Sequence, residues 1–294
     1  MGNSAGLESG LYVVATPIGN LGDMVPRAVE TLQQADLIAA EDTRHSAPLL
    51  KHFSIETPMI AYHDHSNEAA VSRIQRCIEA GGAVALISDA GTPLISDPGY
   101  RLLKYAHEQG WRVVPIPGAS ALTAALSVAG LATDRFRFEG FLPAKAAARQ
   151  SRLEALAAES ATLVFYEAPH RLLTTLKDLQ GPFEETRRLA VTRELTKQFE
   201  EVWRGTLAEA IAHFTTTPPK GEFTLVIAGK PPSETPPLTV EELTAQLTNL
   251  LAQGLSRSQA SRQLAQTTSY SKREIYQLAI ELPDPTIAEG DESP

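Results

Sequence analysis

The stretch Leu86-Ile87-Ser88-Asp89-Ala90-Gly91-Thr92-Pro93-Leu94-Ile95-Ser96-Asp97-Pro98-Gly99 decides the fold, because an apolar strand runs here into a turn of small residues. A second strand of this kind leads into the turn Pro117-Gly118-Ala119-Ser120-Ala121. In an open α/β sheet the carboxyl ends of the strands face the ligand crevice, and glycine there lets backbone N–H groups come close to a ligand. The two turns therefore predict one sizeable small-molecule site.

Composition limits the class of protein. The chain has 294 residues, a net charge of -9 and one cysteine, Cys77. It has no apolar run of the roughly 18 to 20 residues that a membrane helix needs, and no secretion signal, so we expect a cytoplasmic protein without a membrane segment. Cys77 lies in the apolar pattern of a helix expected over 68–80, which predicts a buried, inert thiol.

The negative charge excludes a protein that coats nucleic acid with its whole surface, because phosphate binding depends on Lys and Arg. It leaves room for a local basic site. The basic residues gather in two clusters, Lys145, Arg149 and Arg152, and then Arg257, Arg262, Lys272 and Arg273. Either cluster is also explained by solvated helix faces.

Strands alternate with helices over most of the chain, which predicts an α/β fold with a mostly parallel first sheet. We expect one α/β domain over 1–132 and a second over 133–230. In the first, Asp97 with Pro98 predicts the start of a helix, and Gly110 and Gly130 predict helix ends. The strands are expected over 11–14, 37–40, 59–61, 84–87 and 113–116, and then over 136–141, 163–166, 189–193 and 223–228.

The C-terminal part is predicted to be a separate small module. A proline-rich linker is expected over 231–238, a helix-turn-helix-like module over 239–283 and a disordered acidic tail over 284–294. Three capping boxes mark the helix starts, at Thr239, Ser256 and Ser271. The module serves either packing and dimerisation or nucleic-acid contact through the second basic cluster.

Several common motifs are absent from the sequence. It contains neither the glycine pattern of dinucleotide sites nor that of the phosphate-binding loop. The histidines have no zinc spacing, so we expect no metal site. Ser120 is interpreted as a helix-start residue, because the following residues lack the last glycine of a nucleophile elbow.

A series of motifs in fixed order carries a family resemblance. They are Thr16-Pro17-Ile18-Gly19-Asn20-Leu21-Gly22-Asp23, Glu41-Asp42-Thr43-Arg44, Ser88-Asp89-Ala90-Gly91-Thr92-Pro93, Pro117-Gly118-Ala119-Ser120-Ala121, Glu139-Gly140-Phe141-Leu142-Pro143, Tyr166-Glu167-Ala168-Pro169-His170-Arg171, Arg193-Glu194-Leu195-Thr196-Lys197 and Gly221-Glu222-Phe223. Together they resemble the bacterial methyltransferases that modify a cytidine 2′-oxygen of small-subunit ribosomal RNA, in the tetrapyrrole methylase superfamily.

The resemblance implies two α/β domains of the tetrapyrrole methylase type with S-adenosylmethionine in the cleft between them, and a homodimer. It implies 2′-O-methylation of a cytidine in 16S rRNA at the decoding region, with rRNA or the assembled small subunit as partner. The chain lacks the Gly-Pro-Gly-Asp loop of many tetrapyrrole methylases, which favours the RNA branch. The alternatives are a tetrapyrrole C-methyltransferase of the same fold and a non-catalytic RNA-binding or ribosome-assembly protein.

The residues at these motifs suit such a cofactor. Asp89 is expected to accept hydrogen bonds from the ribose, and the N–H groups of Ala119, Ser120 and Ala121 to hold a polar group. An apolar slot is expected from Leu94, Ile95, Phe141, Leu142, Tyr166 and Ala168. The same turns place Ser88, Ala90, Gly91, Pro117, Gly118 and Glu167 in the predicted cofactor site.

Methyl transfer to a hydroxyl benefits from a base or from a cation that stabilises the alkoxide. The candidates at motif positions are Asp42, Arg44, Lys145, Glu167, Arg193, Glu194 and Lys197. A structural salt bridge is the alternative for each of them, and the sequence does not identify the base.

Overall fold

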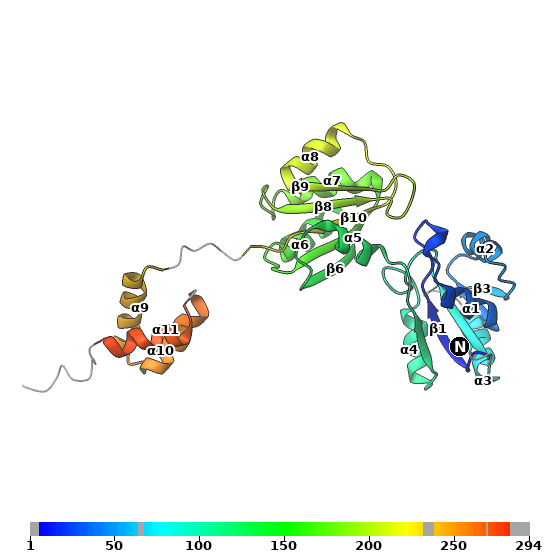
Figure 1. The fold of residues 1–294 in the computed structure, drawn as a ribbon, viewed down its shortest axis with the longest axis horizontal. Coiled ribbons are helices and arrows are strands. Elements are labelled where there is room, and N and C mark those ends of the chain that lie inside the picture. The colour runs from blue at the N-terminus through cyan, green and yellow to red at the C-terminus, as the bar shows by residue number, and fades with distance from the viewer. Residues whose placement is uncertain (1–5, 64–67, 232–237, 269, 283–294) are drawn as a thin grey trace, which may run out of the picture. The chain divides into compact units, whose positions relative to one another are not determined.

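The computed structural model describes residues 6–63, 68–231, 238–268 and 270–282. Contacts within the chain divide it into two compact units, Met1–Lys230 and Pro231–Pro294 (Figure 1). Most of the proposed linker and all of the proposed tail lie outside the described residues.

The first sheet is entirely parallel, with the order β3-β2-β4-β1-β5. Its strands are β1 (Gly10–Val14), β2 (Leu37–Ala40), β3 (Met59–Ala61), β4 (Ala83–Ile87) and β5 (Val113–Ile116). β2 and β4 are buried along their whole length, as a sheet covered on both faces requires. This confirms the parallel sheet predicted from the alternating pattern.

Helices cover both faces of this sheet. α1 (Pro26–Gln34) and α2 (Thr43–His52) pack on one face, and α3 (Glu68–Glu79) and α4 (Tyr100–Glu108) on the other. Cys77 lies on α3, where burial raises the pKa of its thiol. The side chain is only partly buried, so the predicted full burial is wrong, whereas the raised pKa agrees with the predicted inert thiol.

The second sheet is mixed, with the order β6-β7-β10-β8-β9 and a single parallel pair, β6 with β7. Its strands are β6 (Phe136–Phe141), β7 (Thr162–Glu167), β8 (Arg188–Arg193), β9 (Glu201–Thr206) and β10 (Phe223–Ile227). One face packs on α6 (Ala146–Leu156), α7 (Pro169–Leu179) and α8 (Leu207–Thr216). The strand β9 is missing from the sequence prediction. An edge strand with few buried residues shows only a weak alternation of apolar and polar residues.

The other face of the second sheet is covered by α5 (Ala121–Ala129). Ala125 and Leu126 of this helix pack on Val164 and Val226 of the sheet. α5 precedes the proposed domain boundary at 132/133, yet its apolar face belongs to the second core. The helix therefore connects the loops of the first sheet to the body of the second.

The sequence prediction at Asp97 and Pro98 is wrong. α4 begins at Tyr100 and its N-cap is Gly99, with φ 132°, so Asp97 caps no helix. Gly130 does end α5 in the left-handed region, and Gly110, with φ 69°, follows the end of α4. The glycine stops are thus confirmed and the aspartate start is not.

The expectation that Arg149 contributes to a local basic site, with Lys145 and Arg152, is also wrong. Arg149 is buried on α6, where its Nε lies 2.6 Å from Asp178 Oδ2 and its Nη1 donates to the carbonyls of Pro143 and Ala144. Lys145, at the N-cap of the same helix, is exposed. Of these two residues only Lys145 is placed to meet a phosphate.

The C-terminal unit is a three-helix module of α9 (Val240–Ala252), α10 (Arg257–Thr267) and α11 (Lys272–Glu281). All three predicted capping boxes are present, and Gly254 follows the end of α9 with φ 85°. Leu243 and Leu247 of α9 pack with Ile275 and Ala279 of α11 in its own core. Arg262, Lys272 and Arg273 are exposed on its surface.

Candidate functional site

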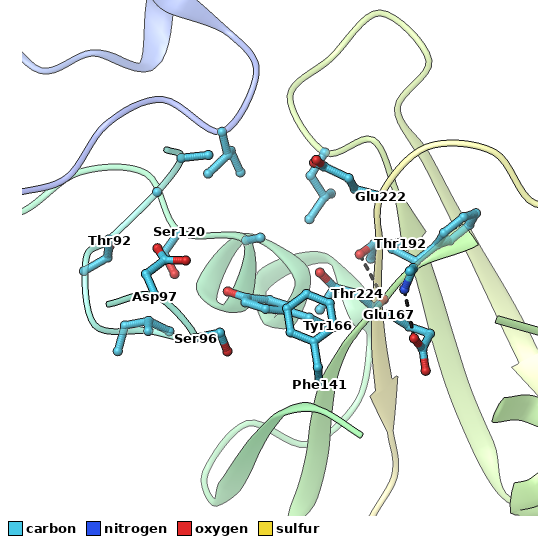
Figure 2. A pocket seen from close by; sticks show the side chains of 18 of the residues that line it. Thr92, Ser96, Asp97, Ser120, Phe141, Tyr166, Glu167, Thr192, Glu222 and Thr224 are labelled. Atoms are coloured by element: carbon cyan, nitrogen blue, oxygen red, sulfur yellow. Dashed lines mark hydrogen bonds between the residues drawn. The ribbon is translucent and has the colours of Figure 1, made fainter. Parts of the chain in front are cut away.

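A cavity of about 340 Å³ opens in the first unit between the loop after β4 and the strand ends of the second sheet (Figure 2). Register in the second sheet pairs Phe223 with both Glu167 and Arg193, so the start of β10 meets the ends of β7 and β8 there. The lining is Ile18, Ala90, Gly91, Thr92, Ile95, Ser96, Asp97, Ser120, Ala121, Phe141, Tyr166, Glu167, Ala168, Pro169, Thr192, Leu195, Glu222, Phe223 and Thr224.

The loop after β4 is held in an unusual backbone conformation. Leu94 and Ser96 have φ of 73° and 68°, in the left-handed region that non-glycine residues rarely occupy. Thr16 and Gly91 exchange backbone hydrogen bonds of 2.8 and 3.1 Å, which tie the loop to the turn after β1. Such strain persists only where surrounding contacts enforce it, and it is common at ligand sites.

The two halves of the site approach closely at Gly140. A Cβ on this residue would lie 2.9 Å from the Ser96 hydroxyl, so a side chain there would push the loop away. Gly140 has φ 62° and interrupts the register of β6. Glycine is required at this position for both the backbone conformation and the contact.

Asp97 supplies a carboxylate to the cavity wall. Burial, together with the charges of Glu41 and Asp89, raises the pKa of Asp97 to about 6, although a hydrogen bond from Ser88 acts in the opposite direction. The part of the chain that the structure describes places no basic side chain within ion-pair distance of Asp97. In Figure 2 its carboxylate lies on the same side of the cavity as Ser120.

Asp89 plays a different part from the one expected. Its Oδ1 accepts the Asp42 N–H at 3.1 Å, and its own N–H donates to Glu41 at 3.3 Å. Asp89 therefore joins the ends of β2 and β4 and does not line the cavity. Its contact with a cofactor ribose remains a prediction.

Aromatic rings form the wall opposite this loop. The rings of Phe141 and Tyr166 lie 5.7 Å apart at 63°. The Tyr166 hydroxyl accepts the Leu122 N–H at 3.2 Å, which ties β7 to the start of α5. Burial raises the pKa of Tyr166, so this wall is apolar and uncharged at neutral pH.

Glu167 lies at the end of β7, and its carboxylate is fully buried. It accepts hydrogen bonds from the Thr175 hydroxyl at 2.6 Å and from the Ala168 N–H at 2.9 Å. Arg171 Nε lies 3.4 Å from the same carboxylate and its Nη2 donates to the Leu142 carbonyl. Glu167 is thus held by three groups of the second sheet and its helix α7.

Lys197 forms an ion-pair network at the rim. Its Nζ lies 2.7 Å from Glu222, a cavity residue, and 3.0 Å from Glu194. Burial disfavours its charge, but these carboxylates prevail and raise the pKa of Lys197. The Lys197 side chain occupies the space that a Cβ on Gly19 would need. Lys197 therefore packs against Gly19 and also joins the two halves of the unit.

The remaining catalytic candidates lie off the cavity lining. Arg193 donates to the Lys220 carbonyl at 2.7 Å and lies 3.3 Å from Glu201. Asp42 caps α2 and binds Arg44 at 2.7 Å, and this partner holds the pKa of Asp42 well below its usual range. Lys145 is exposed at the start of α6. These residues remain predictions without a contact to the cavity.

The cofactor residues proposed from the sequence divide into two groups. The cavity brings together Ala90, Gly91, Ile95, Ser120, Ala121, Phe141, Tyr166, Glu167 and Ala168. Outside its lining lie Ser88, Asp89, Leu94, Pro117, Gly118, Ala119 and Leu142. Gly118 and Ala119 line an adjoining groove of about 500 Å³, which shares Ile18 and Ser120 with the cavity.

Sequence reasoning missed the lining residues Ile18, Thr92, Ser96, Asp97, Pro169, Thr192, Leu195, Glu222, Phe223 and Thr224. Most of them lie inside the motifs that carried the resemblance, so the signal was present but not assigned. Thr192 and Thr224 lie on neighbouring strands, where the Thr192 hydroxyl donates to the Thr224 carbonyl at 3.1 Å. Strand pairing alone brings these two residues to the site.

Two absences apply to the described residues. None of their helices is long and apolar enough to cross a membrane. Their His, Cys, Asp and Glu side chains form no group of three or more that could hold a metal ion.

Comparison with known proteins gives the family. Residues 10–211 match the family model of Tetrapyrrole (Corrin/Porphyrin) Methylases. A Synechocystis sp. protein named "Ribosomal RNA small subunit methyltransferase I" is 58% identical over 92% of this chain and 98% of its own length. A protein of the same name from Haemophilus influenzae is 46% identical over 92% of this chain and 96% of its own.

Solved structures share the fold at low identity. A cobalt precorrin-4 methyltransferase matches with a TM-score of 0.57 at 16% identity, covering 74% of this chain and 94% of that one. Uroporphyrin-III-C-methyltransferase from Thermus thermophilus matches with a TM-score of 0.54 at 19% identity, covering 75% and 94%. Fold, family model and relatives agree: the chain belongs to the tetrapyrrole methylase family and, within it, to the ribosomal RNA small subunit methyltransferase I group.

Proposed function

We propose that this protein transfers a methyl group from S-adenosylmethionine to the ribose 2′-oxygen of a cytidine in small-subunit rRNA, at the decoding region. It acts as a homodimer, on free rRNA or on the assembled subunit. The observation that carries the proposal is the acidic, aromatic-walled cavity at the strand ends, in a chain whose relatives are named for small-subunit rRNA methylation.

The cavity fits such a methyl donor. Its volume of about 340 Å³ lies within the range of small-molecule sites, roughly 300 to 1,000 Å³. Phe141 and Tyr166 supply aromatic, apolar surface to the cavity, and the start of α5, with Ser120 and Ala121, lies at its wall. The Asp97 carboxylate, which has no ion-pair partner among the described residues, matches a ligand that carries positive charge.

When bound, the donor supplies an activated methyl group on a sulfonium. The residues of this chain position the acceptor and stabilise charge on its oxygen, since geometry alone accelerates such a displacement by orders of magnitude. Lys197, with its raised pKa, remains protonated and is therefore suited to stabilise the developing alkoxide. The same raised pKa makes Lys197 unsuitable as the base.

The adjoining groove is where we place the acceptor ribose. Four hydroxyl side chains and one carboxylate line it, on Ser120, Thr123, Ser127, Thr196 and Asp23. The Thr196 hydroxyl is buried and has no hydrogen-bond partner in the described part of the chain. A sugar offers the donors and acceptors that such a lining needs. Because the groove and the cavity meet at Ile18 and Ser120, an acceptor there lies beside the donor.

The proposal is tested by label transfer. The purified protein is incubated with S-adenosylmethionine labelled in the methyl group and with small subunits from a strain that lacks the modification. We expect label on the ribose of one cytidine after digestion and mass spectrometry, and parallel reactions with free rRNA identify the substrate form. Transfer to a tetrapyrrole instead would support the C-methyltransferase alternative. Cofactor-independent RNA binding without transfer would support the assembly-protein alternative.

The helical module is proposed to contact rRNA. Because its core is its own, deletion of residues 238–294 is expected to leave a folded protein that still binds S-adenosylmethionine. Methylation of rRNA is expected to fall about tenfold or more, because exposed cations such as Lys272 and Arg273 are lost. Calorimetry with the cofactor and label transfer to small subunits measure the two effects. Aggregation of the truncated protein would instead assign the module to packing or to the dimer.

A further inference from the structure

The charge of the cavity is one-sided. Among the described residues, its lining includes the acidic residues Asp97, Glu167 and Glu222 and no lysine, arginine or histidine. Glu167 is neutralised by Arg171, and Glu222 by Lys197. Asp97 alone among these lining carboxylates has no basic partner in the described residues. The electrostatic environment of the cavity therefore favours a positively charged ligand group near Asp97.

A half-buried carboxylate without a partner is costly, because it has lost part of its hydration without gaining a counter-charge. Two neighbouring carboxylates, Glu41 and Asp89, add repulsion. A ligand that brings a cation to this wall relieves both effects. The energetic gain depends on the charge of the ligand and is lost when that charge disappears.

The wall opposite favours a particular kind of cation. The Asp97 carboxylate is close enough to Tyr166 to help raise the pKa of its hydroxyl, and Phe141 packs beside Tyr166 (Figure 2). Aromatic faces attract weakly hydrated cations that carry alkyl groups, as in cages for quaternary ammonium. A primary ammonium prefers hydrogen-bond acceptors. A carboxylate facing aromatic rings thus suits an alkylated sulfonium.

We propose that Asp97, with Tyr166 and Phe141, recognises the sulfonium charge, so that the cavity binds the methyl donor more tightly than the uncharged thioether left after transfer. The inference rests on the proposed function. Transfer moves the methyl carbon from sulfur to the ribose oxygen, the C–S electron pair stays on sulfur, and the hydroxyl proton leaves to base or solvent. Sulfur becomes neutral, the attraction to Asp97 ends, and the spent cofactor dissociates more readily.

The proposal predicts a pH dependence of binding. Among the described residues, the groups that act on Asp97 are Ser88, Glu41, Asp89 and Tyr166, of which Tyr166 stays neutral because its pKa is raised. Asp97 itself takes up a proton near pH 6. Below that pH the wall loses its charge, so affinity for the sulfonium falls while affinity for the neutral thioether changes little.

The test is isothermal titration of the full chain with three ligands. S-adenosylmethionine carries the sulfonium, sinefungin carries an amine cation at the same place, and S-adenosylhomocysteine is neutral there. For Asp97→Asn we expect affinity for the two cationic ligands to fall about tenfold or more, and affinity for the neutral one to fall about twofold at most. Asp134→Asn, which removes an exposed charge, is the matched control.

An equal loss for all three ligands would overturn the proposal, because Asp97 would then contact the ribose or the amino-acid end that they share. A second measurement needs no variant. The ratio of S-adenosylmethionine to S-adenosylhomocysteine affinity of the unaltered protein must fall between pH 7.5 and pH 5.5, and a constant ratio also overturns the proposal. If the unaltered protein binds none of the three ligands, the proposed function fails instead.

Discussion

The two walls of the cavity treat their carboxylates in opposite ways. On the wall built by the second sheet, Glu167 is fully buried and bound by Thr175, Ala168 and Arg171. On the wall built by the loop after β4, Asp97 receives one side-chain hydrogen bond and no ion pair from the described residues. A carboxylate that is buried and paired with an arginine maintains the architecture, whereas one without an ion-pair partner is available to a ligand.

Backbone strain does not distinguish the two walls. Leu94 and Ser96 on one side, and Glu194 and Thr196 on the other, all have positive φ. Both loops are therefore fixed in costly conformations by their surroundings. The difference lies in the charges, and the following variants test it from the largest expected effect to the smallest.

Glu167→Ala is expected to lower the free energy of unfolding by about 3 to 5 kcal/mol, because it leaves Arg171 and Thr175 without their buried partner. Urea denaturation followed by circular dichroism measures the loss. Glu167→Gln keeps the shape and one acceptor oxygen, so its loss should be smaller. A change below about 1 kcal/mol for the alanine variant would show that this wall does not depend on the pair.

Lys197→Ala is expected to slow methyl transfer about 100-fold, which corresponds to about 2.7 kcal/mol in the barrier, because it removes the cation that we propose to stabilise the acceptor oxygen. Binding of the donor should change little, since Lys197 does not line the cavity. Single-turnover label transfer and calorimetry separate the two effects. Lys197→Arg keeps the charge and should retain more of the rate. Equal rates for the alanine variant and the unaltered protein would make Lys197 a purely structural link.

Arg149→Ala is expected to destabilise the fold by about 2 kcal/mol, because the buried Asp178 contact and two carbonyl contacts are lost. Lys145→Ala, on the same helix, should leave stability unchanged and weaken rRNA binding. It should also reduce the salt dependence of binding by about one counterion. Thermal unfolding and rRNA affinity over a salt series measure both. If the two variants changed stability and rRNA binding by the same amounts, the distinction between the paired and the exposed charge would be wrong.

Asp97→Asn is expected to stabilise the ligand-free protein by about 1 kcal/mol at pH 7.5 and by about half as much at pH 5, which lies between the unfolded and folded pKa values. The pKa of Asp97 is raised in the folded state to about 6, above the ordinary value of an unfolded chain, about 3.9. Its contribution to stability is therefore complete below the unfolded pKa and is lost as pH rises through about 6. Melting temperatures of both proteins at the two pH values measure the effect. A gap that does not widen with pH would contradict the unpaired state of Asp97.

The sequence by itself determined the features that depend on neighbours along the chain. The alternation of apolar runs and helices predicted the first sheet, and the residue pairs at Thr239, Ser256 and Ser271 predicted three capped helices. Nine of the sixteen residues that it proposed for the cofactor line the cavity, because parallel strands bring their carboxyl ends to one edge. Such signals depend on residues that are close together in the sequence, so they can be interpreted without the tertiary structure.

Tertiary structure decided what each charged group does. Asp97 followed by Pro98 predicted a helix start, yet the helix begins at Tyr100 and Asp97 lines the cavity. Arg149 looked like its neighbour Lys145, but only Arg149 meets Asp178 across two helices. Whether a charge finds a partner depends on residues far away in the chain, and the cost of burying it depends on that partner. The spacing of residues along the sequence does not show which of them meet in space. Only the folded chain therefore distinguishes a charged group that stabilises the site from one that is available to bind a ligand.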